Sequence, residues 1–215
     1  MPIEIKHVIT PGTLTRTPQP TLRTPDGELA LQAPALSHAQ AVHDAFQDPA
    51  LRYWHARSME SLDEARAWVV EAQEGWRREK AAQWIVTRAS DGTPLGRMAL
   101  RDMNLLDGLA EIGYWVMPQA RGQGVAPMAL TALTDWALGV GFHRLDLEHS
   151  TRNEASCRVA LKAGYPLEGT RRSSALHTDG WHDMHVHVRI QDAGRTPWTP
   201  VLQGRPSDAE AQKHS

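Results

Sequence analysis

The sequence predicts an α/β fold, a layered domain in which a mixed β-sheet is flanked by helices. Apolar residues switch repeatedly between the two-residue alternation of strands and the 3.6-residue spacing of helices. The predicted strands come first in a run and then alternate with helices, an order that favours a mixed sheet. A chain of 215 residues with 41% hydrophobic residues is long enough to bury one sizeable core.

The first predicted elements are short. Residues 28–33 alternate as a strand. Ser37 and Gln40 have the spacing of a capping box, so we expect a helix to begin there and to end at Asp48-Pro49.

A second capping box, Ser61 with Glu64, opens a longer helix. One apolar stripe runs along this helix, and it is formed by Leu62, Ala65, Val69, Ala72 and Trp76. The remaining predicted elements, in order, are strands at 84–88 and 95–103 around a tight turn at 91–94, a strand at 109–117, a helix at 125–138, a strand at 143–148, a helix at 153–162 and strands at 165–170 and 183–190.

Both ends of the chain differ in composition from the middle. Residues 1–27 carry five prolines among threonine and arginine, so we expect a mobile arm with little to bury. Residues 191–215 form a polar tail with three prolines. The folded domain is therefore expected at 28–190.

Composition excludes several classes of protein. A formal net charge of −2 gives no electrostatic footprint for nucleic acid or for an anionic membrane. The single cysteine, Cys157, excludes an intrachain disulfide and a cysteine-rich zinc site. The start of the chain does not resemble a signal peptide, and no stretch reaches the ~20 apolar residues of a membrane span. We expect a cytoplasmic monomer or homodimer.

The most informative stretch is a glycine turn between a predicted strand and a predicted helix. The strand ends at Met117, and Arg121-Gly122-Gln123-Gly124-Val125-Ala126 leads into the helix. Paired glycines let consecutive N–H groups face one point, and the helix start adds a positive field. These features favour an anion site for a phosphate or pyrophosphate, although a glycine turn without a ligand is the alternative.

Four segments together resemble the GNAT superfamily of acetyltransferases, in particular its RimJ/RimL-type N-acetyltransferases. The glycine turn fits the Q/R-x-x-G-x-G/A motif of that family. The other three segments are residues 110–115 (AEIGYW), residues 153–165 (NEAS followed by KAGY) and residues 180–183 (GWHD). The resemblance covers about 28–190 and implies a three-layer domain whose mixed sheet splays open beside the strand at 109–117.

The resemblance also implies acetyl-CoA as cosubstrate and names the residues that would bind it. Backbone amides of Arg121, Gly122, Gln123, Gly124, Val125 and Ala126 would hold the pyrophosphate. Val116 and Met117 would bond the pantetheine arm through their backbone, because a splayed strand leaves polar groups unpaired. Asn153 would reach the pantetheine through its side chain, or cap the helix.

Two residues are the predicted catalytic groups. Ser156 matches a family serine near the CoA sulfur and would stabilise the developing thiolate; the alternative is a polar residue in a first helical turn. Glu111 lies on the strand that would border the cofactor, and it is the predicted general base. The alternative is a structural glutamate that pairs with an arginine. RimL-type enzymes carry a further glutamate where this chain has Ala175, and Cys157 is expected to serve packing.

Histidines and aromatic residues near the expected site gave two weaker hypotheses. His177, His182, His185 and His187 cluster near the last hairpin, and His185 and His187 share one strand face. Because the sequence offers no third ligand with characteristic spacing, no metal site is predicted, and a titrating histidine is the preferred role. Tyr53, Trp54, Trp68 and Trp76 would line an acceptor groove or belong to the core.

The sequence therefore predicts an acetyl-CoA-dependent N-acetyltransferase that acts by direct transfer in a ternary complex. A protein or peptide N-terminal α-amine is the preferred acceptor, and a small amine such as an aminoglycoside, polyamine or amino acid is the alternative. A non-catalytic acyl-CoA-binding module is the third hypothesis. An acidic groove would favour a polycation, and an open slot beside the last hairpin would favour a peptide.

Overall fold

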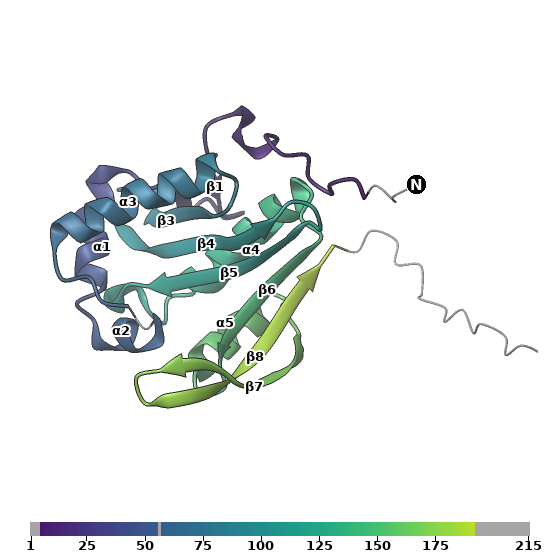
Figure 1. Cartoon of the computed structure of the whole chain (residues 1–215). Helices are drawn as coiled ribbons and strands as arrows, with labels where there is room; N and C mark the ends of the chain where they lie inside the picture. Colours follow the sequence, from purple (N-terminus) through teal and green to yellow (C-terminus); the bar gives the residue numbers. More distant parts are fainter. Residues whose placement is uncertain (1–4, 56, 192–215) are drawn as a thin grey trace, which may run out of the picture.

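A computed structural model describes residues 5–55 and 57–191 of the chain. They form an eight-stranded sheet in the order β1-β2-β3-β4-β5-β6-β8-β7, flanked by helices (Figure 1). Neighbouring strands run antiparallel except for β5 and β6, which are parallel. The predicted mixed sheet between helical layers is thus confirmed.

Most predicted elements lie within a few residues of their predicted bounds. The strands are β1 (Leu22–Arg23), β2 (Leu29–Gln32), β3 (Ala82–Arg88), β4 (Pro94–Asn104), β5 (Leu109–Val116), β6 (Arg144–Ser150), β7 (Leu167–His177) and β8 (Gly180–Ile190). The helices are α1 (Ala39–Ala45), α2 (Pro49–His55), α3 (Leu62–Arg77), α4 (Val125–Gly139) and α5 (Glu154–Lys162), with short 3₁₀ turns η1 (Leu14–Arg16), η2 (Leu36–His38) and η3 (Pro118–Ala120).

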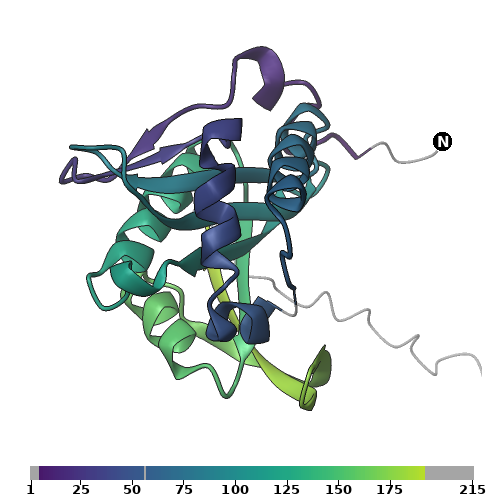
Figure 2. The same ribbon diagram turned by 90° about the vertical axis from the view of Figure 1, so that its left-hand side faces the viewer.

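The helices cover two different faces of the sheet (Figure 2). Helix α3 packs on β3 with α1 beside it, whereas α4 and α5 pack on the other side against β4, β5 and β6. Side chains alternate along a strand. On β5, Glu111, Gly113 and Trp115 therefore point to what we name the α3 face, and Ile112 and Tyr114 point to the α5 face. A contact between Trp115 and Phe46, next to α1, agrees with this assignment.

The sheet opens between β5 and β6. Their parallel pairing runs from Leu109 with Arg144 to Ile112 with Leu147. Beyond that point β5 stays paired with β4 as far as Val116, and β6 stays paired with β8 as far as Ser150. The two halves of the sheet therefore diverge, as Figure 1 shows, and the expected splay beside β5 is confirmed.

Helix α3 begins as predicted. The Ser61 hydroxyl accepts the Glu64 N–H at 3.2 Å, which is the expected cap. The predicted stripe is largely buried, and Trp68 joins it. Trp76 packs near Trp84, with 6.4 Å between ring centroids. These two helical tryptophans of α3 are core residues and line no groove.

The predicted capping box at Ser37 is wrong. The Gln40 amide donates to Asp44 at 2.8 Å, and His38 Nδ1 accepts the Ala35 N–H. The Asp48-Pro49 pair ends α1 but also starts α2, which was not predicted. Asp48 accepts the N–H groups of the next turn, because a free side-chain oxygen there replaces the missing helical acceptors.

The amino-terminal segment differs from the expected mobile arm. Ile9, Leu14 and Leu22 are buried in the main core. The carboxylate of Glu79, itself 7% exposed, accepts the N–H groups of Gly12, Leu14 and Thr15. A buried carboxylate needs such donors, so this contact holds the segment down even though its prolines prevent a long helix. The expected polar tail at 191–215 lies outside the described residues except for Gln191.

Across the described ranges, no helix has the length and apolar character that crossing a membrane requires.

Candidate active site

The glycine turn has the conformation that its sequence predicts. Gly122 and Gly124 have φ of +76° and +78°, a region that other residues rarely adopt. Gly124 is the residue before α4. Within the described part of the chain, the backbone N–H groups of residues 122–126 donate to no protein acceptor. Five unpaired donors at a helix start can hold an anion.

Arg121 is engaged elsewhere. Its guanidinium lies 3.0 Å from a carboxylate oxygen of Asp48, and its backbone N–H donates to Pro118. Although burial alone would raise the pKa of Asp48, the hydrogen bond from Arg121 and those from the α2 amides lower it. Arg121 therefore ties the turn to α2, and its charge is already compensated within the protein.

A cavity of about 630 Å³ lies beside the turn. It is lined by Gln123, Val125 and Met128 on one side and by residues of the β1–β2 and β3–β4 turns on the other, including Arg23 and Arg88. Neither Glu111 nor Ser156 lines it. The cavity is therefore suited to the distal, anionic part of a long ligand and not to the reacting group.

The open edge of β5 offers fewer free backbone groups than expected. The Met117 N–H donates to Leu95 at 2.9 Å, and the Met117 carbonyl accepts from Ala120. Because neighbouring residues of a strand point their polar groups to opposite edges, the N–H and C=O of Val116 point into the gap toward β6. The backbone groups of Val116 are thus available to a ligand in the gap, whereas those of Met117 are occupied within the protein.

A hydroxyl pair spans the gap on the α5 face. The Tyr114 hydroxyl and Ser156 Oγ lie 2.8 Å apart, one on β5 and the other on α5. Ser156 is only 8% exposed. Burial raises the pKa of Tyr114 to about 12, against the lowering effect of its hydrogen bond with Ser156. The Tyr114 hydroxyl therefore stays protonated at neutral pH, and it is a partner of Ser156 that sequence reasoning missed.

Asn153 caps α5. Its side-chain oxygen accepts the Ser156 N–H at 3.1 Å, so the predicted capping role is present. The cap also fixes the first turn of α5, and with it the position of Ser156.

Glu111 lies on the opposite face from this hydroxyl pair. It pairs with Arg101 across β4 and β5, so the structural alternative for this glutamate is realised. Burial nevertheless raises the pKa of Glu111, against Arg101 and with help from the carboxylate of Glu148. A carboxylate with a raised pKa is a better proton acceptor near neutral pH, so the ion pair does not exclude a role as base.

The acidic groups on the α3 face of β5 and β6 are compensated by arginine. The three ion pairs are Glu111 with Arg101, Asp146 with Arg144, and Glu148 with Arg171. Burial lowers the pKa of His55 on α2 to about 4, with Arg97 and Arg101 adding to the effect. His55 is therefore neutral at pH 7, and this face presents no acidic groove.

A hydrogen-bonded cluster joins α2 to the β7–β8 hairpin on the same face. The Tyr53 hydroxyl donates to Asp179 at 2.8 Å, and Asp179 also contacts His182 Nε2 at 2.8 Å. His182 Nδ1 lies 2.8 Å from Ser150 Oγ. His177 stacks on His182, with 4.1 Å between centroids. An open slot between residues 37–60 and the last hairpin would have favoured a peptide acceptor, but side chains bridge these two regions.

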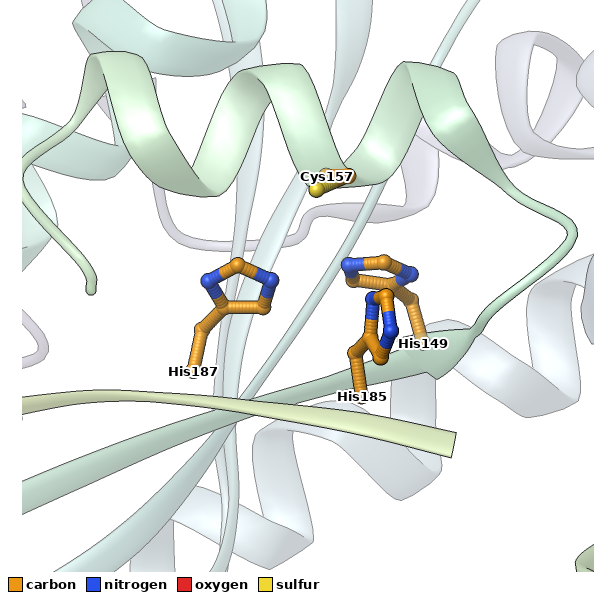
Figure 3. A group of neighbouring side chains, drawn as sticks. All are labelled: His149, Cys157, His185 and His187. Atoms are coloured by element: carbon orange, nitrogen blue, oxygen red, sulfur yellow. The ribbon is translucent and has the colours of Figure 1, made fainter. Parts of the chain in front are cut away.

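The four histidines of the last hairpin do not form one group. His177 and His182 belong to the cluster just described, whereas His185 and His187 point to the α5 face and meet His149. Cys157 lies on α5 above them (Figure 3).

The comparisons with known proteins agree with this geometry. The family model described as "Acetyltransferase (GNAT) domain" matches residues 28–166. The ribosomal-protein-serine acetyltransferase of Escherichia coli is 31% identical over 100 residues, which are 46% of this chain and 56% of that protein. The uncharacterized N-acetyltransferase YoaA of Bacillus subtilis is 24% identical over 155 residues, 71% of this chain and 88% of that one.

The solved structure of RimL, a ribosomal L7/L12 alpha-N-protein acetyltransferase in complex with coenzyme A, has the same fold. Its TM-score is 0.70 at 24% identity, covering 80% of this chain and 99% of that one. At this identity the likeness shows the fold.

Proposed function

Because this chain belongs to the GNAT acetyltransferase family and is an N-acetyltransferase, we propose that it acetylates the N-terminal α-amine of a protein or peptide. Transfer from acetyl-CoA would be direct, within a ternary complex. The predicted family, three-layer fold and enzyme class are confirmed. The third hypothesis, a non-catalytic acyl-CoA-binding module, is therefore set aside.

The residues present fit acetyl-CoA. The five free N–H groups of residues 122–126 lie at the start of α4 and would bind the pyrophosphate. Val116 would bond the pantetheine in the gap, with the Asn153 amide beside it. The cosubstrate would supply the activated acetyl group, and the fork between β5 and β6 would direct its thioester toward Tyr114 and Ser156.

The single observation that carries the mechanism is the Tyr114–Ser156 hydrogen bond across the splay. A buried serine hydroxyl, polarised by a tyrosine that stays protonated, can donate to a developing thiolate. Glu111 on the other face would take the proton of the attacking amine. Acid and base thus approach the same gap from opposite faces of the sheet.

The charges of the α3 face support an α-amine as acceptor. Glu111, Asp146 and Glu148, the described acids of β5 and β6 on this face, are each paired with arginine, which leaves them less able to hold a polycation such as a polyamine. An arginine-rich surface disfavours a bound ammonium ion. α-Amino groups have a pKa near ~7.7–8.0, well below the ~10.4 of lysine, so their neutral form is the most available.

The relatives support the same choice of acceptor. The Escherichia coli protein is named for acetylating a ribosomal-protein serine, and RimL for an α-N-protein activity. Ala175 replaces the glutamate that RimL-type enzymes carry, so Glu111 would have to act without it.

Calorimetry with acetyl-CoA tests the cofactor site first. We expect binding well below the millimolar range, since a millimolar Kd is only about −4 kcal/mol. Absence of heat at millimolar acetyl-CoA would contradict the assignment of residues 122–126.

A panel of acceptors then tests the proposed substrate class. Peptides with free N-termini, their N-formylated counterparts, and small amines are compared by thiol release from acetyl-CoA. We expect turnover with free α-amines and none with the blocked peptides. A polyamine or aminoglycoside turned over faster than every peptide would establish the alternative acceptor.

A further inference from the structure

Three imidazoles and one thiol meet between the sheet and α5. His149 on β6, His185 and His187 on β8, and Cys157 on α5 each offer a ligand atom, and these four atoms lie within 4.8 Å of one another (Figure 3). His149 and His185 are directly opposite each other across the two strands. The figure shows Cys157 pointing from the helix toward the three rings.

The imidazole nitrogens in this group lack partners. Among the described residues, the buried side-chain nitrogen and oxygen atoms without a hydrogen bond are Nε2 of His149, Nδ1 of His185 and Nε2 of His187. His149 and His187 are 5% and 0% exposed. Buried polar atoms are nearly always satisfied, so three orphans in one cluster require an explanation.

The opposite ring nitrogens fix the tautomers. His149 Nδ1 lies 2.8 Å from the Ser150 carbonyl, and His187 Nδ1 lies 2.9 Å from the Tyr165 carbonyl. Because a carbonyl can only accept, each Nδ1 carries the proton and each Nε2 presents a lone pair. Histidines that bind metals are oriented in this way, with the second nitrogen held by a carbonyl or carboxylate.

The ligand atoms of the three rings and of the thiol are crowded together, within 4.8 Å of one another. Lone pairs that face one another across a buried gap repel, and a bound cation removes that repulsion.

We propose that His149, Cys157, His185 and His187 form a structural site for Zn²⁺. Three imidazoles and one thiolate make a four-ligand set that zinc prefers in tetrahedral geometry. In such a centre the ligand atoms lie about 3.3–3.6 Å apart, so the group must contract by roughly 1 Å at its widest. His185 and Cys157 are only half-buried, which gives the ion access from solvent.

The site would anchor α5 to the sheet. Ser156 points across the gap to Tyr114, and Cys157, the next residue, points to β6 and β8. With all four positions filled by protein, the ion has no open position for substrate and stabilises the fold. The proposal is independent of the transfer reaction, and its test does not read activity.

Sequence could supply only part of this group. The spacing of His185 and His187 indicated two ligands on one strand face. The third and fourth come from β6, which pairs with β8, and from α5, which packs against β6, and neither contact is visible in the sequence.

Cobalt spectroscopy tests the site. Tag-free full-length protein, stripped with a chelator, is titrated with Co²⁺. We expect one equivalent to bind, with a thiolate-to-cobalt charge-transfer band and the intense visible bands of tetrahedral Co²⁺, both removed by Zn²⁺. Because Cys157 is the single cysteine, any thiolate band must arise from it.

Two variants and one control decide the outcome. Cys157→Ala should lose the charge-transfer band. Cys157→Ala and His149→Gln should each bind Zn²⁺ at least a hundredfold more weakly than the wild type. This loss exceeds the ~10–100-fold typical of removing a residue that only hydrogen-bonds to a metal ligand. His143→Ala, at an exposed histidine outside the group, should keep both properties.

Thermal melts with and without Zn²⁺ separate metal binding from misfolding. Metal-free wild type and Cys157→Ala should melt at similar temperatures, and only the wild type should gain stability from Zn²⁺. Absence of a charge-transfer band in the wild type, or equal Zn²⁺ affinity in Cys157→Ala and His143→Ala, would overturn the proposal.

Discussion

The two faces of the sheet at the β5–β6 fork carry different chemistry. On the α5 face, the polar groups are neutral: the hydroxyls of Tyr114 and Ser156 and the backbone N–H groups at the start of α4. On the α3 face, they are charged and paired, with Glu111 against Arg101 as the example nearest the fork. Both faces meet at one gap.

This difference suits the two halves of an acetyl transfer. A thiolate that develops on one side would be stabilised by hydroxyl donors that stay protonated at neutral pH, because burial keeps the tyrosine pKa high. An ammonium that must lose its proton on the other side would need a carboxylate, and Glu111, whose pKa is raised by burial, is the candidate. Substitutions on both faces test whether the two faces divide the work in this way.

The largest effect is expected at Glu111. Glu111→Gln keeps the shape of the side chain but cannot accept a proton, so turnover at neutral pH should fall about 10²–10⁴-fold. The acidic limb of the pH–rate profile should flatten, while the Kd for acetyl-CoA stays near the wild-type value. Full activity with an unchanged profile would move the base to His177 or to a water.

The hydroxyl pair should have the next largest effect. Ser156→Ala should lower turnover about tenfold to a thousandfold and leave acetyl-CoA affinity nearly intact. Tyr114→Phe should lower turnover less, because it removes only the polarising partner.

The double variant sharpens the assignment of this pair. If the two hydroxyls act as one unit, Ser156→Ala combined with Tyr114→Phe should be no slower than Ser156→Ala alone. Fully multiplicative effects in stopped-flow rates would show that the two act separately.

The glycine turn should contribute affinity and not rate. Gly124→Asp puts a negative charge at the start of α4, and acetyl-CoA should bind about fivefold to thirtyfold more weakly, in line with ~1–2 kcal/mol for a charge at a helix end. Gly124→Asn is the matched control, since asparagine has the same shape and tolerates positive φ. A Cβ at Gly124 meets only Met128, at 3.7 Å, so both proteins should fold. Equal calorimetric affinities in the two variants would show that no anion binds here.

The sequence predicted the α5 face better than the α3 face. Glycine spacing and the capping asparagine are local patterns, so the turn at Gly122 and Gly124 and the cap at Asn153 could be predicted from neighbouring residues. Tyr114 could not be assigned, because its partner Ser156 is 42 positions away and only the splay brings the two together. The available signal for Tyr114 was that it lies on the strand expected to border the cofactor, beside which the family serine was also expected.

On the α3 face, the contacts are almost all long-range. Arg101 meets Glu111 through the register of β4 with β5, and Asp179 meets Tyr53 across 126 positions. Helix α2 was missed because Asp48-Pro49 ends one helix and starts the next, and either reading fits the same two residues. Which charged residues pair across strands depends on the strand register. The register is set by the need to bury the apolar side chains of the whole sheet, so it cannot be predicted from neighbouring residues alone.

The smallest expected effect tests the electrostatics of Glu111 itself. Arg101 lowers the pKa of Glu111 and Glu148 raises it. A base is active when deprotonated, so Arg101→Gln should move the acidic limb of the pH–rate profile to higher pH and reduce turnover a few-fold near neutrality. Glu148→Gln removes a like charge and should move the same limb to lower pH. Opposite shifts from two substitutions on the strands that flank β5 cannot come from a general loss of stability, which would move both profiles alike. If both variants leave the limb in place, the titrating group is not Glu111, and His177 or a water becomes the candidate base.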